Sequence, residues 1–83
     1  MASLQFAIDS ICSKLTVETM YRLVRDRLGQ GPFTLSEIIP LVQREDRSLD
    51  RDSARWLVEA ACAELAQRGE IRIDGELARA PEG

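Results

Sequence analysis

The chain has 83 residues, which is enough for one small domain and too few for a multidomain enzyme. Hydrophobic residues make up 45% of it and charged residues 30%, a balance typical of a folded globular protein that excludes a disordered or collagen-like chain. Eleven Lys and Arg against fourteen Asp and Glu leave a formal net charge of -3, the wrong sign for a protein that coats nucleic acid. Any contact with DNA must therefore come from a local patch.

Apolar side chains at helical spacing predict a short amphipathic helix within residues 1–15. This stripe comprises Leu4, Ala7, Ile8, Ile11, Cys12 and Leu15. Phe6 lies off the stripe. Asp9 and Lys14 interrupt the apolar run and no basic segment precedes it, so the pattern fits neither a signal peptide nor a membrane span. We therefore expect a cytoplasmic protein with no membrane partner.

A second helix is predicted over residues 17–28, where apolar side chains again recur at intervals of three and four. Thr16 can cap its first turn. The Gly-Gln-Gly-Pro segment at 29–32 ends it, because glycine readily adopts the left-handed cap conformation and proline does not continue a helix.

A third, short helix is predicted to begin at Thr34 and to run to about Gln43. Thr34 and Glu37 have the spacing of a capping box, in which each side chain satisfies the other's free backbone N–H. Pro40 should kink or shorten this helix, unless Ser36 is the true cap and Pro40 lies nearer the first turn. A polar loop over residues 44–50 is expected to follow.

The longest helix is predicted over residues 51–68, with Asp50 as its cap and Gly69 at its end. A hairpin follows, because residues 70–73 alternate in polarity and Asp74-Gly75 is a strong two-residue turn signal. Its inward-facing residues are expected to be Ile71, Ile73 and Leu77. Residues 81–83 are expected to be a frayed end.

Residues 17–80 resemble the winged helix-turn-helix superfamily in the order of their elements. The resemblance lies in Phe33-Thr34-Leu35-Ser36-Glu37-Ile38 at the entry to the second core helix, and in Leu65-Ala66-Gln67-Arg68-Gly69-Glu70-Ile71 at the helix-to-wing junction. It implies a mainly α fold with a small β-hairpin wing. The winged-helix domain would span residues 16–80, with residues 1–15 as an extra N-terminal helix.

The residues that carry catalysis are nearly absent. The chain contains no His, so Ser-His or Cys-His nucleophile pairs cannot form, and two Cys alone do not make the usual four-ligand zinc site. Cys12 and Cys62 are expected to be buried, reduced thiols. The acidic pairs Glu45/Asp46 and Asp50/Asp52 are expected to form surface ion pairs with nearby arginines. The sequence therefore predicts a non-enzymatic protein without metal or cofactor.

Binding of double-stranded DNA is the first functional hypothesis, because the resemblance implies that the helix at 51–68 enters the major groove. The candidate DNA-binding residues are Arg47, Arg51, Arg55 and Arg72. Residues 44–55 contain four Arg and four acids, so a salt-bridged polar loop is an equally open interpretation. A small transcriptional regulator of this kind would be a homodimer, with the N-terminal helix as its dimer element.

Protein binding, as in an adaptor module, is the second hypothesis. Trp56 falls about 140° from the centre of the buried stripe on a helical wheel, and its candidate interface neighbours are Ala60 and Ala63. Glu59 in the same patch would repel phosphates. An alternative is that the N-terminal helix, or the same helix of a dimer mate, covers Trp56 and enlarges the core.

Overall fold

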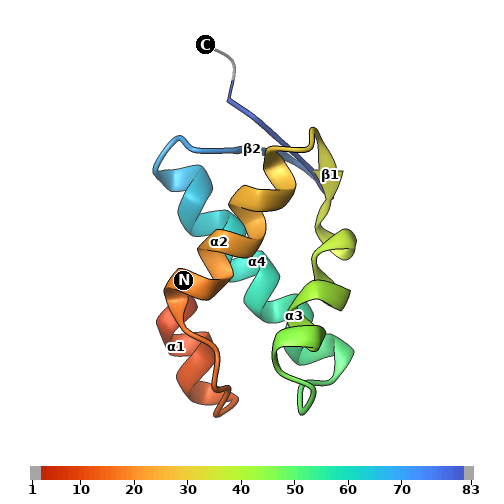
Figure 1. The fold of residues 1–83 in the computed structure, drawn as a ribbon. Helices are drawn as coiled ribbons and strands as arrows, with labels where there is room; N and C mark the ends of the chain where they lie inside the picture. Colours follow the sequence, from red (N-terminus) through yellow and green to blue (C-terminus); the bar gives the residue numbers. More distant parts are fainter. Residues whose placement is uncertain (1–2, 82–83) are drawn as a thin grey trace.

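The computed structural model describes residues 3–81, and Figure 1 shows their arrangement. Within this range the chain forms the helices α1 (Leu4–Ser10), α2 (Val17–Leu28), α3 (Ile39–Glu45) and α4 (Arg51–Gln67), with one turn of 3-10 helix, η1 (Leu35–Glu37). The strands β1 (Phe33–Thr34), β2 (Arg72–Asp74) and β3 (Leu77–Arg79) form an antiparallel sheet in the order β1-β3-β2. The fold is therefore mainly helical with a small sheet, as predicted, but β1 adds a strand to the expected hairpin.

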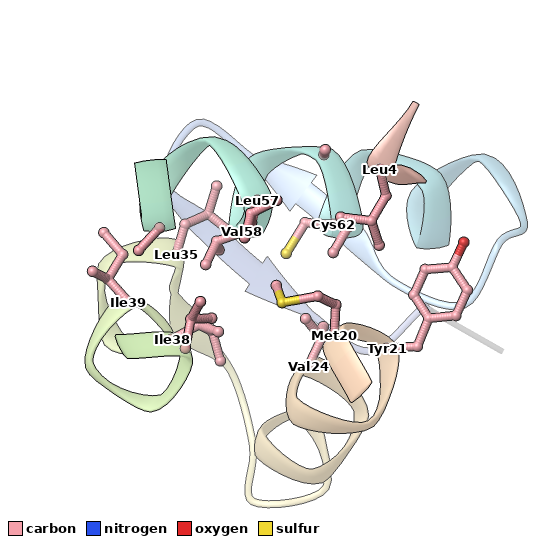
Figure 2. Packing of buried hydrophobic residues seen from close by; sticks show 14 of the residues in the cluster. Leu4, Met20, Tyr21, Val24, Leu35, Ile38, Ile39, Leu57, Val58 and Cys62 are labelled. Carbon is pink, nitrogen blue, oxygen red and sulfur yellow. The ribbon is translucent and has the colours of Figure 1, made fainter. Parts of the chain in front are cut away.

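The core lies around α4, against which α1, α2 and α3 all pack. Met20 of α2 and Cys62 of α4 point toward one another at its centre (Figure 2), and both are fully buried. Burial raises the pKa of the Cys62 thiol to about 12, because a thiolate there would lose its hydration. Cys62 is thus buried as expected.

The first helix is shorter than expected, since α1 ends at Ser10. The N–H of Cys12 donates to the Asp9 carbonyl (3.2 Å) and the N–H of Ser13 donates to the Ile8 carbonyl (3.0 Å), which is the hydrogen-bond pattern of a Schellman cap. Cys12 takes the left-handed position of this cap, with φ of 53°. Cys12 is consequently exposed, so the expectation of a buried thiol there is wrong. Residues 1–2 of the expected helix and 82–83 of the expected tail lie outside the described residues.

The predicted caps at the starts of the two longer helices are confirmed, and α4 ends at Gln67, one residue before the predicted end. The Thr16 hydroxyl accepts from the N–H of Thr19 (3.1 Å) at the start of α2. The Asp50 carboxylate accepts from the N–H of Ser53 (2.7 Å) at the start of α4, which lowers the pKa of Asp50. Gly69 follows α4 with φ of 78°, a conformation that glycine adopts without strain.

The expected third helix is divided into two parts. Glu37 accepts from the N–H of Thr34 (2.7 Å) in the predicted capping box, but this box closes only the single turn η1. The helix α3 begins at Ile39, which places Pro40 in its first turn, where the missing N–H costs no hydrogen bond. The break after η1 therefore accommodates the proline without a kink.

The hairpin has a two-residue turn, but its turn residues are Gly75-Glu76 rather than the predicted Asp74-Gly75, and the prediction that Leu77 faces inward is wrong. Ala78 is opposite both Ile73 of β2 and Phe33 of β1, whereas Leu77 is opposite Asp74. Because residues directly opposite each other share a face of the sheet, Ala78 joins Ile73 and Phe33 on the core side. Ala78 is 0% exposed and Leu77 is 41% exposed.

Candidate interaction surfaces on α4 and α1

Arg55, one of the candidate DNA-binding residues, is engaged by acidic side chains. Its guanidinium forms an ion pair with Glu76 in the hairpin turn, a second with Glu59 one turn along α4 (3.6 Å), and a hydrogen bond to the Ser36 hydroxyl (3.4 Å). These contacts raise the pKa of Arg55, chiefly through Glu76, and lower the pKa of Glu76. Arg55 thus connects α4 to the sheet and to η1.

The tip of the hairpin is acidic. Asp74 and Glu76 flank Gly75 and both are exposed. Arg79 forms an ion pair with Asp74 (3.1 Å), and the candidate residue Arg72 lies exposed on β2, opposite Arg79. The two hairpin arginines therefore lie next to a carboxylate-bearing turn.

Arg47 and Arg51 remain exposed at the N-terminal end of α4. Asp50 and Asp52 are exposed beside them, so the formal charge of these four side chains cancels. Arg44 is exposed at the end of α3, where its neighbour Glu45 faces Arg22 at 3.8 Å. The structure therefore brings arginines together near the start of α4, but with matching acids.

Asp46 is buried, with 2% of its surface exposed, and the expected surface ion pair is wrong for this residue. Its carboxylate accepts hydrogen bonds from the hydroxyl (2.6 Å) and N–H (3.1 Å) of Ser48, the Ser13 hydroxyl (2.9 Å) and the Lys14 N–H (3.3 Å). These donors lower its pKa to about 2, the Ser48 hydroxyl contributing most. Asp46 therefore connects the loop after α1 to the loop after α3, and it is not part of the charged surface near the start of α4.

Trp56 contacts Phe6, a residue for which the sequence pattern predicts no role. The rings of Phe6 and Trp56 lie edge to face, with centroids 6.5 Å apart and an interplanar angle of 75°. Phe6 is 57% exposed, whereas Trp56 is half-buried and packs against the core. The signal for Phe6 in the sequence was its position off the apolar stripe of α1.

The two alanines expected beside Trp56 have different environments. Ala60 is buried and belongs to the core, so it offers little surface to a partner. Ala63 is half-buried and lies two turns after Trp56 on the same side of α4. Phe6, Trp56 and Ala63 together are called the aromatic surface below.

The alternative that the N-terminal helix of the same protomer covers Trp56 is confirmed in part. The protomer's own α1 packs on α4 and contacts Trp56 through Phe6. Leu4, Ala7 and Ile8 of the apolar stripe are buried in the core. The part of the stripe that lies on α1 is therefore already covered within one protomer.

A partly buried carboxylate fixes α1 in this position. Glu64 of α4 accepts a hydrogen bond from the N–H of Leu4 (2.6 Å) and another from the hydroxyl of Tyr21 in α2. The Tyr21 hydroxyl points toward α4 (Figure 2). Desolvation and the Glu64 hydrogen bond raise the pKa of Tyr21. Phe6 is thus carried on a helix that is anchored at its start.

Acidic side chains border the aromatic surface. Asp52 lies one turn before Trp56 and Glu59 one turn after it, while Asp9 lies one turn after Phe6. All three are exposed. We call Asp9, Asp52 and Glu59 the acidic rim.

Within residues 3–81 there is no group of three or more metal-ligating side chains, and none of the helices there is both long and apolar enough to cross a bilayer. Comparisons of the chain with protein-family models, curated proteins and solved structures give no match. The functional argument therefore depends on the surfaces described above.

Proposed function

We propose that the chain is a small, non-enzymatic protein-interaction module of winged-helix architecture, which binds a partner protein through the aromatic surface. The winged-helix assignment is supported by the order α2, β1, α3, α4, β2, β3 and by the β1-β3-β2 sheet. In this arrangement α1 is an addition that supplies Phe6.

The observation that carries this proposal is the contact of Phe6 with Trp56. Phe6 and Leu77 are the large hydrophobic residues with most exposure in the described part of the chain, and only Phe6 forms an aromatic pair. Aromatic side chains are enriched among residues that dominate binding energy at interfaces. Nearby, the pairing of Arg55 with Glu76 and Glu59 disfavours a role in reading DNA.

The test begins with affinity capture by the unmutated protein, followed by purification of the enriched protein and measurement of its Kd. Phe6→Ala and Trp56→Ala are expected to weaken this purified complex about 30-fold, equivalent to about 2 kcal/mol. Leu77→Ala is the matched control, since it removes an exposed apolar side chain from the sheet. A partner that binds Phe6→Ala and Leu77→Ala equally well contradicts the proposal.

A DNA-binding transcriptional regulator is the second candidate, favoured by the exposure of Arg47 and Arg51 at the N-terminal end of α4. A homodimer of this regulator would have to use Phe6 rather than the buried stripe of α1. The test is a gel shift at low salt with double-stranded DNA from the native promoter region. Arg47→Ala with Arg51→Ala should abolish the shift, whereas Arg22→Ala with Arg25→Ala, which removes the same charge from α2, should retain it. No shift by the unmutated protein rejects this candidate.

A further inference from the structure

The acidic rim gives the aromatic surface a charge preference. The part of α1 at residues 4–10 carries no Lys or Arg, and on α4 the arginine nearest to Trp56 is Arg55. The charge of Arg55 is already opposed by Glu59 and Glu76. The carboxylates of Asp9 and Asp52 are exposed beside the aromatic pair. Arg51, which balances the formal charge of Asp52, lies about 140° around α4 from Trp56 and therefore away from that pair.

From this geometry we infer that the aromatic surface binds a basic amphipathic segment of another protein, with apolar side chains next to Lys or Arg. This inference rests on the proposed function and adds the chemistry of the partner. The apolar side chains would cover Phe6 and Trp56, and the cations would lie against the acidic rim. Such complementary charges speed association and reject wrongly charged partners.

The same rim argues against a second copy of this chain as the occupant. In a two-fold dimer the same patch lies on both sides of the interface. Two acidic rims would then face each other, and like charges at close range oppose association. The net charge of -3 acts in the same direction.

The experiment uses Trp56 as an internal probe, because it is the single Trp of the chain. The protein is titrated with two synthetic amphipathic peptides of about four helical turns, one of Leu and Lys and the other of Leu and Glu in the same pattern. Neither peptide contains an aromatic residue. We expect a saturable shift of Trp56 emission to shorter wavelength with the Leu/Lys peptide and none with the Leu/Glu peptide.

Charge variants then locate the effect. Asp52→Asn with Glu59→Gln is expected to weaken binding of the Leu/Lys peptide about tenfold. Glu18→Gln with Asp26→Asn makes the same change of charge on α2 and is expected to alter binding by less than about twofold, because exposed charges farther away are screened. Asp9→Asn tests the acidic rim on α1 without changing any residue of α4. Thermal unfolding verifies that each variant is folded.

The possible failures are distinguishable. Equal affinity for both peptides, no binding of either, or equal effects of the two double variants would overturn the basic-partner inference. Loss of binding in Phe6→Ala would still support the aromatic surface in the first and third of these cases. Self-association that increases with concentration in sedimentation, and that Phe6→Ser abolishes, would identify a second copy as the occupant and overturn the inference.

Discussion

Ser13 and Asp46, 33 residues apart in the sequence, are joined by a hydrogen bond of 2.9 Å from the serine hydroxyl to the carboxylate. This bond closes the loop between α1 and α2 onto the loop between α3 and α4. Asp46 is buried and ionised, since its pKa is lowered to about 2 by the donors around it. The attachment of α1 to the core thus depends on the carboxylates of Asp46 and Glu64 as well as on apolar packing.

Asp46→Asn is expected to lower the free energy of unfolding by about 2 kcal/mol at neutral pH, because the amide cannot replace a carboxylate that accepts several hydrogen bonds. The folded-state pKa of about 2 lies below the ordinary value of 3.8, so the stabilisation is present above that ordinary value. It is lost as pH falls from about 4 to about 2. Urea unfolding of both proteins across this range measures the difference, in which contributions of the other carboxylates cancel. A difference that stays constant down to pH about 2 contradicts this account.

Local signals in the sequence predicted the ends of α2 and α4, because a cap requires only residues within one turn of the helix end. Thr16, Asp50 and Gly69 are examples. The burial of Asp46 and the pairing of Arg55 with Glu76 were not predictable in this way, since each requires a partner distant in the sequence: Ser13 lies 33 residues from Asp46, and Glu76 lies 21 residues from Arg55. Of the two aromatic residues of the aromatic surface, only Trp56 could be singled out from its position on the helical wheel. The contact of Phe6 with Trp56 depends on how α1 packs on α4, which local sequence signals do not give.

The sheet register predicts opposite effects for two neighbouring residues. Leu77→Thr should change the free energy of unfolding by less than about 0.5 kcal/mol, because this side chain is on the solvent side of β3. Ala78→Leu should cost about 1–3 kcal/mol, because the larger side chain must enter the packed side between Ile73 and Phe33. Chemical denaturation of both variants measures this. The reverse order of the two effects would mean that the hairpin is shifted by one residue.

The two thiols are expected to react at very different rates with a thiol-specific reagent such as dithionitrobenzoate. Cys12 is exposed and should react at once, whereas Cys62 is buried beside Met20 and its pKa is raised to about 12. Cys62 should therefore react only as the protein unfolds. Cys12→Ser leaves Cys62 as the only thiol, and its labelling rate should rise with urea in step with unfolding. Immediate labelling of Cys62 in native buffer would contradict its place in the core.

Stability measurements separate the binding and packing roles of α1. Phe6→Ala should cost about 1 kcal/mol or less, because the residue is 57% exposed and loses little beyond its edge-to-face contact with Trp56. Ile8→Ala should cost about 2–5 kcal/mol, since its side chain is buried in the core and the substitution leaves a cavity. Urea unfolding followed by circular dichroism compares the two variants without relying on Trp56. If Phe6→Ala proves as costly as Ile8→Ala, Phe6 serves to hold α1 on α4 and the case for an aromatic binding surface is lost. If it is nearly neutral, a large aromatic side chain is held in solvent at little benefit to folding, as expected of a residue that contacts a partner.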